Sequence, residues 1–94
     1  MDRIARIKSM EKKLDASLRA VRAFERALER YLGAQEDIRV LEAYFTGSDW
    51  REDFAADEQG LLPPSLKRGV LSEDGVDPLL EENGALRRRL AELL

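Results

Sequence analysis

Cysteine and histidine are both absent from this chain of 94 residues. Without a thiol or an imidazole, the chain has no disulfide, no cysteine or histidine ligand for zinc, and no histidine to act as a general base near neutral pH. Catalysis would have to depend on carboxylates, lysine or tyrosine in an unusual setting. We therefore expect a protein that is not an enzyme and that holds no cofactor or metal.

Aromatic residues are also scarce, at 6%, whereas charged residues make up 37% of the chain. This composition is more typical of a solvated helical protein than of a β-sandwich or barrel. No stretch approaches the roughly 20 apolar residues of a membrane span, and the charged N-terminus is unlike a signal peptide. We expect one small all-α domain over residues 1–94, located in the cytoplasm without a membrane attachment.

Residues 2–32 predict one long amphipathic helix, because apolar residues recur every three or four positions without an intervening proline or glycine. The apolar positions are Ile4, Ile7, Met10, Leu14, Leu18, Val21, Phe24, Leu28, Tyr31 and Leu32. Gly33 either ends this helix or lies inside a longer helix that reaches residue 45. A helix of this length presents more apolar surface than so small a chain is able to cover.

Two shorter segments follow the long helix. Residues 49–58 predict a short helix with Trp50 and Phe54 four positions apart on one face. Residues 61–71 predict a connector, which contains two of the three prolines. We expect both aromatic rings to be buried against the end of the long helix and against the Val70–Leu71 pair.

The start of the C-terminal helix has two conflicting signals. Ser72 is a good N-cap, but a helix that starts there contains Pro78 beyond its first turn. We therefore expect a short turn over residues 72–76 and a helix over residues 78–93. The expected fold is a coiled-coil-like hairpin, in which the long helix packs antiparallel on the C-terminal helix.

Charge is unevenly distributed along the chain. Residues 1–33 carry nine basic and five acidic side chains, whereas residues 34–60 carry two and eight. A row of basic residues follows one side of the long helix, opposite the apolar stripe, and consists of Lys8, Lys12, Arg19, Arg22, Arg26 and Arg30. The row suits a phosphate backbone, but the flanking acids and the net charge of −3 favour a solvated face that the acidic segment balances.

Asp49, Asp53 and Asp57 recur at four-residue intervals. Hard cations bind clustered carboxylates, but the pattern of a calcium loop is absent. We interpret these acids as the solvated side of the short helix and as partners for arginine side chains. The Arg87–Arg89 triplet is also explained without a ligand, since cations near the end of a helix complement its dipole.

Two linked motifs, Asp49-Trp50-Arg51-Glu52-Asp53-Phe54 and Gly69-Val70-Leu71-Ser72-Glu73-Asp74-Gly75, carry a resemblance to a known family. With Leu62-Pro63 between them, they are similar to short bacterial all-helical proteins of the domain of unknown function 4298 type. The resemblance implies no activity, substrate or catalytic residue. The positions that we take as structural are Trp50, Asp53, Phe54, Gly69, Val70, Leu71, Ser72 and Gly75.

The favoured interpretation of function is a non-enzymatic protein–protein interaction module that associates with itself. A second copy would bury the apolar strip that remains on the long helix, which predicts a homodimer. We expect Ile4, Ile7 and Leu14 at this interface. The alternative is an accessory protein that binds nucleic acid through the basic row. The sequence identifies neither a biochemical activity nor an individual partner protein.

Overall fold

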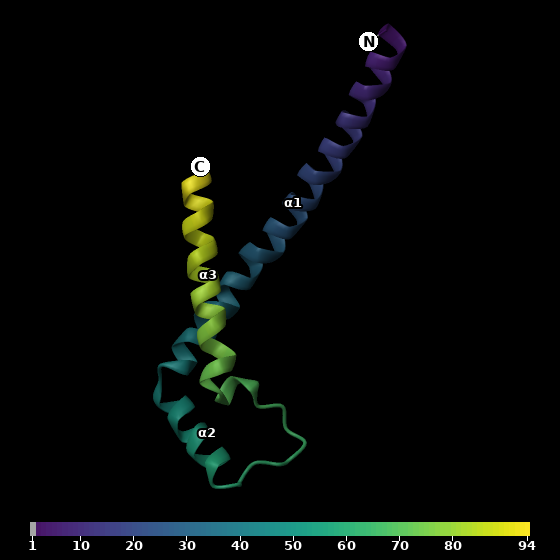
Figure 1. Cartoon of the computed structure of the whole chain (residues 1–94). Coiled ribbons are helices and arrows are strands. Elements are labelled where there is room, and N and C mark those ends of the chain that lie inside the picture. Colours follow the sequence, from purple (N-terminus) through teal and green to yellow (C-terminus); the bar gives the residue numbers. More distant parts are fainter. Residues whose placement is uncertain (1) are drawn as a thin grey trace. The chain divides into compact units, whose positions relative to one another are not determined.

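The computed structural model of the chain is all-α, as the sequence predicts, and it describes residues 2–94 apart from the side chain of residue 73. The α-helices are α1 (Arg3–Phe45), α2 (Ser48–Glu58) and α3 (Glu73–Leu93), and the short 3-10 helix η1 (Gly69–Leu71) comes just before α3 (Figure 1). The described residues include no strand. The chain forms two compact units, residues 1–35 and residues 36–94.

Helix α1 continues through Gly33, so the structure has the longer of the two helices that the sequence allows. The carboxylate of Asp2 caps its start by accepting a hydrogen bond from the backbone N–H of Ala5 at 2.7 Å. Gly33 does not have the positive φ of a helix-ending glycine, unlike Gly60. One interior glycine costs only about 1 kcal/mol, and the good helix formers around it maintain the helix.

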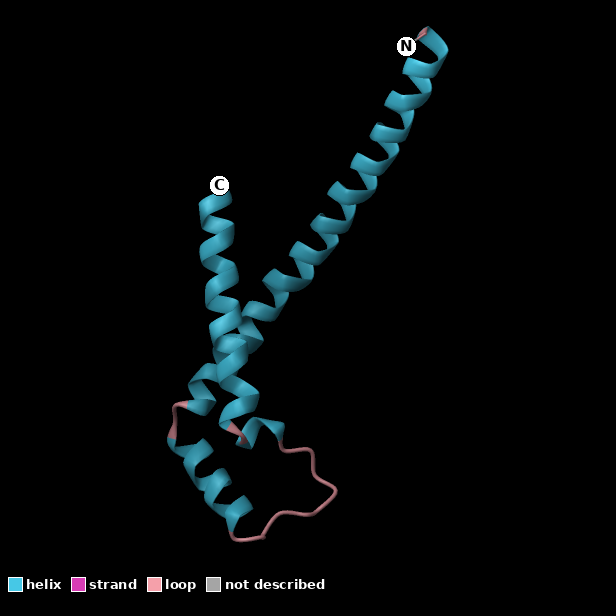
Figure 2. Ribbon diagram, viewed as in Figure 1, coloured by secondary structure: helices cyan, strands magenta, loops and turns pink. Residues whose placement is uncertain are grey.

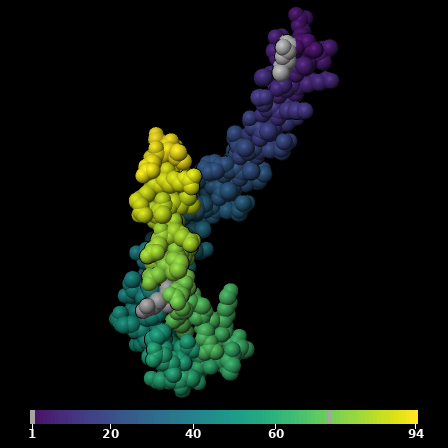
Figure 3. All heavy atoms as spheres, in the orientation of Figure 1, coloured from purple at the N-terminus to yellow at the C-terminus, as the bar shows by residue number. Residues whose placement is uncertain are grey.

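In the first unit, every described residue after the capping Asp2 belongs to α1. In the space-filling view this segment is a rod one helix wide (Figure 3). Between residues 4 and 24, all seven large apolar side chains are 39–67% exposed. These residues, which we call the apolar stripe, are Ile4, Ile7, Met10, Leu14, Leu18, Val21 and Phe24. A single helix has no means of burying its own apolar face, so the stripe remains accessible to water.

The second unit contains the packed part of the chain. Residues 36–45 of α1 lead into α2, then into a connector, η1 and α3 (Figure 2). α3 runs in the direction opposite to residues 36–45, as the predicted antiparallel hairpin requires (Figure 1). Among the described residues, only Leu71 (6% exposed) and Val76 (3%) are buried. The core is therefore a small cluster around η1 and the first turns of α3.

The two ends of α2 are both set by glycines. Gly47 takes the N-cap position, so α2 begins at Ser48, one residue before the predicted start. After the helix, Gly60 has a φ of 71°, a conformation that favours glycine. The N–H groups of Gly60 and Leu61 then donate to the carbonyls of Asp57 and Ala56, both at 3.0 Å, which is the Schellman arrangement.

Helix α3 begins at Glu73, so the prediction of a turn over residues 72–76 and a helix from residue 78 was wrong. Ser72 has the extended backbone of an N-cap, with φ −103° and ψ 132°. Pro78 therefore lies inside the helix, where its missing N–H removes one bond to the carbonyl of Asp74. Because Asp74 is exposed, water is able to take the place of that donor.

Candidate interaction surfaces and the motif beside them

Three aromatic rings join α1 to α2 in the second unit. The ring of Trp50 lies edge-on to Phe45, with centroids 5.1 Å apart at 77°, and stacks on Phe54 at 5.0 Å and 15°. Its indole N–H donates to the carbonyl of Val70 at 2.8 Å and so links α2 to η1. Trp50 and Phe54 are half-buried rather than buried as expected, because α2 and η1 are too short to enclose two large rings.

The second motif is built around a close contact between two glycine backbones. A Cβ atom at Gly75 would overlap the carbonyl oxygen of Gly69, whereas one at Gly69 would meet nothing within 4 Å. The N–H of Ser72 donates to the carbonyl of Gly69 at 3.2 Å, and that of Gly75 to the carbonyl of Ser72 at 3.0 Å. This contact sets the start of α3 against η1, next to the buried Leu71.

Two of the three aspartates on α2 have protein partners. The hydroxyl of Tyr44 donates to Asp53 at 2.7 Å, and Asp57 forms an ion pair with Arg68. The hydrogen bond to Asp53, with burial and nearby negative charge, raises the pKa of Tyr44 to about 12. Within the part of the chain that the structure describes, no group of acids is placed to hold a metal ion.

Sequence reasoning missed both Tyr44 and Arg68 as members of this site. The available signals were weak: Tyr44 directly precedes Phe45 at the end of α1, and Arg68 directly precedes Gly69. The sequence spacing does not identify either partner. Tyr44 and Asp53 are nine positions apart across a turn, and Asp57 and Arg68 are eleven positions apart across the connector. Such pairs depend on the path of the turn and the connector, which periodicity does not specify.

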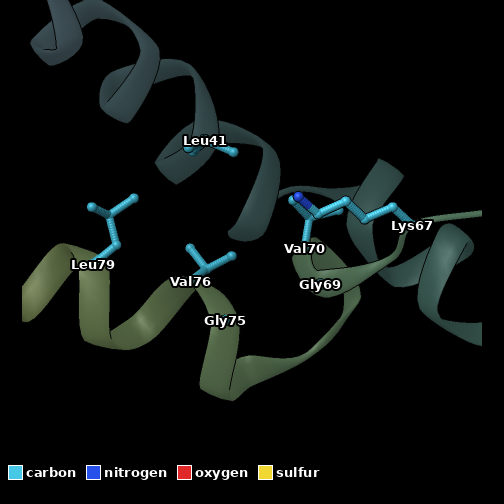
Figure 4. Close-up of a pocket in the computed structure, with 7 residues that line it drawn as sticks. All are labelled: Leu41, Lys67, Gly69, Val70, Gly75, Val76 and Leu79. Atoms are coloured by element: carbon cyan, nitrogen blue, oxygen red, sulfur yellow. The ribbon is translucent and has the colours of Figure 1, made fainter.

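An apolar hollow of about 330 Å³ lies between the end of α1, η1 and α3 (Figure 4). Val76 and Leu79 point from α3 toward Leu41 on α1, and Lys67 reaches its edge from the connector. The lining residues are Leu41, Lys67, Gly69, Val70, Gly75, Val76 and Leu79. Because these side chains are apolar except for one lysine, the hollow provides contact surface rather than a set of reacting groups.

The residues predicted for an interface lie in the first unit. Ile4, Ile7 and Leu14 are 67%, 53% and 52% exposed. Their spacing places them on one side of α1, together with the rest of the apolar stripe. The structure thus brings the predicted interface residues together on a surface that a partner is able to reach.

The six residues of the basic row are also exposed on α1. The ion pairs recorded among residues 2–94 join Arg39 to Glu36 and Arg68 to Asp57, and neither includes a member of the row. These basic side chains thus remain available to a partner. None of the described helices is both long enough and apolar enough to cross a membrane.

These features define a small all-α protein with an exposed apolar stripe and a compact aromatic and glycine motif. Residues 7–92 match the family described as Domain of unknown function (DUF4298), so the chain belongs to this family. The matched region includes both motifs and nearly all of α1 and α3, and the predicted family is confirmed. Neither the curated proteins nor the solved structures contain a match to the chain.

Proposed function

We propose that this protein is a non-enzymatic interaction module that forms a homodimer through the apolar stripe of α1. The observation that carries this proposal is the continuous exposure of the stripe along one helix that buries none of its residues. All seven large side chains of the stripe are at least 39% exposed, whereas only Leu71 and Val76 are buried among the described residues. Removing apolar surface from water contributes about 25 cal/mol per Å², so covering the stripe is favourable.

A second copy of the chain is the partner that supplies a matching surface. A two-fold symmetric pair uses the same patch twice, so one apolar stripe covers the other. The absence of cysteine and histidine supports a role in contact rather than catalysis. Tyr44 is paired with Asp53 and Arg68 with Asp57, which supports a structural role for these polar groups near the motif. We place this dimer in the bacterial cytoplasm.

Multi-angle light scattering at tens of micromolar tests this proposal. We expect the wild-type chain to have twice the single-chain mass of 10.7 kDa. Ile7→Glu/Leu14→Glu places two charges in the stripe and should return the mass to one chain, because an unpaired charge is costly to bury at an interface. Lys12→Gln/Arg19→Gln, on the opposite side of α1, is the matched control and should remain dimeric. A wild-type mass of one chain over this range would overturn the proposal.

The second candidate function is nucleic acid binding through the basic row. One observation favours it: all six basic side chains are exposed and outside the two recorded ion pairs. Filter binding at about 50 mM salt is a permissive assay, since phosphate contacts are strong at low salt. Binding that weakens steeply with salt and is lost in Arg22→Glu/Arg26→Glu would support this candidate. The absence of such binding would rule out this second candidate.

A further inference from the structure

The seven stripe residues between positions 4 and 24 are symmetric about Leu14, and the exposed Leu32 lies beyond this symmetric part of α1. Counted from Leu14, the other stripe residues lie four, seven and ten positions away on both sides, as the pairs Met10 and Leu18, Ile7 and Val21, and Ile4 and Phe24. At 1.5 Å per residue, the members of each pair are equally distant from Leu14, at about 6, 10 and 15 Å. Because α1 is uninterrupted over this range, the symmetry of the sequence is also a symmetry of the surface.

We infer that two copies of the chain pack antiparallel along α1, with the two-fold axis beside Leu14. The inference rests on the self-association proposed above and adds the direction and register of the pair. In this arrangement Leu14 of one copy lies level with Leu14 of the other copy. Each other stripe residue lies level with its pair member in the second copy, so that Ile7 of one chain is level with Val21 of the other. Every level of the interface then contains apolar residues from both copies.

A parallel pair of helices in register would also place apolar residues of the two copies at the same level. The distribution of charge favours the antiparallel pair over this alternative. Residues 3–13 carry five basic side chains and one acidic, whereas residues 15–25 carry two of each. A parallel pair places the two basic segments side by side, where they repel. The antiparallel pair places each basic segment beside the neutral segment of the other copy, with Arg3 level with Glu25. Helix dipoles also favour antiparallel neighbours.

Spin labels on single cysteines distinguish the two directions, and the chain has no native cysteine to interfere. Lys12 and Arg30 are suitable sites, because 18 residues make five full turns and both face the same way, away from the stripe. Antiparallel packing about Leu14 predicts separations along the axis of about 6 Å for Lys12→Cys and about 48 Å for Arg30→Cys. Double electron–electron resonance should therefore show a much longer distance at the second site.

The other possible results of the spin-label measurement would each overturn a specific part of the inference. Equal distances at the two sites would show a parallel pair, and a longer distance at Lys12→Cys would place the axis away from Leu14, so either result overturns the inference. A single-chain mass with no dipolar coupling at either site would instead overturn the self-association on which it rests. Light scattering on the labelled samples separates these two kinds of failure.

A charge exchange provides a second test that does not depend on labels. Arg3→Glu and Glu25→Arg should each weaken the dimer about two- to fivefold, since each removes two exposed ion pairs per dimer. The combined variant restores opposite charges at the same level and should recover most of the wild-type affinity. Additive weakening in the combined variant would contradict the antiparallel register.

Discussion

Residues 2–35 enclose none of their apolar side chains, whereas residues 36–94 build a small core. The first segment repeats apolar residues at helical spacing and leaves them 39–67% exposed between residues 4 and 24. The second also exposes some apolar side chains, such as Leu61 and Leu93 at 69% and 74%, but it encloses Leu71 and Val76 and holds Trp50 against two other rings. A regular pattern thus produces a surface that is available to a partner, whereas an irregular motif produces a shape that the chain completes by itself.

This difference predicts two kinds of response to substitution. Changes in the motif of the second unit should lower the free energy of unfolding, since its contacts lie within the chain. Changes in the apolar stripe should mainly alter association, because the exposed side chains lose little when they are shortened.

Trp50→Ala should have the largest effect on stability, about 3 kcal/mol, as expected for loss of a large packed aromatic ring. The substitution removes the contacts with Phe45 and Phe54 and the hydrogen bond to Val70. Urea unfolding followed by far-ultraviolet circular dichroism measures the change. Phe24→Ala, an aromatic substitution in the stripe, is the matched control and should leave the unfolding of dilute, monomeric protein nearly unchanged. Equal losses in the two variants would remove the distinction between the units.

Gly75→Ala should cost about 1–3 kcal/mol, the usual range for inserting an atom where none fits. The added Cβ overlaps the carbonyl oxygen of Gly69 and pushes the start of α3 away from η1. Gly33→Ala is the opposite case, since its Cβ meets nothing within 4 Å inside α1, and it should stabilise the helix by about 0.5–1 kcal/mol. Urea unfolding curves of the two variants provide the measurement. A stable Gly75→Ala protein would show that the glycine contact is not required.

Tyr44→Phe should have the smallest effect, about 0.5–1 kcal/mol, since it removes one hydrogen bond at the surface. The effect should also depend on pH. Because the pKa of Tyr44 is raised to about 12 from its ordinary value of 10, the bond stabilises the fold fully below pH 10 and is lost as the pH rises from 10 to 12.

The difference in unfolding free energy between wild type and Tyr44→Phe should therefore shrink over that interval. Thermal unfolding at pH 8, 10 and 11.5 provides the comparison, with Tyr31 unchanged in both proteins. A difference that stays constant across these values would contradict the assigned hydrogen bond to Asp53.

Much of the fold could be predicted because it depends on local periodicity. The long helix follows from apolar spacing and good helix formers, and the end of α2 follows from Gly60. The start of α3 could not be predicted from the sequence. Ser72 favours a helix that begins at residue 73, whereas Pro78 favours a later start, and the contact between Gly69 and Gly75 decides between them. That contact is a tertiary feature. Once it has fixed the first turn of α3, Pro78 is tolerated in the second turn.

The candidate site was predictable to a different extent in each unit. The exposed positions of the stripe, such as Ile7 and Leu14, follow from the helical pattern and the small size of the chain. The sequence motifs identify Trp50 and Gly75 as structural residues, but they do not identify the residues that these two contact. The pairing of Tyr44 with Asp53 depends on the turn between α1 and α2, where a small change in backbone direction moves a side chain by several ångströms.

The contacts that close the second unit have a consequence for how quickly it forms. They join residues that are near in sequence: Tyr44 and Asp53 are nine positions apart, Arg68 and Asp57 eleven, and Trp50 and Val70 twenty. Short loops lose little entropy on closure, and domains dominated by local contacts fold within microseconds to milliseconds. Encounter of two chains at micromolar concentration is slower than this. A newly made chain would therefore complete its aromatic and glycine motif first and meet a second copy with that unit already folded.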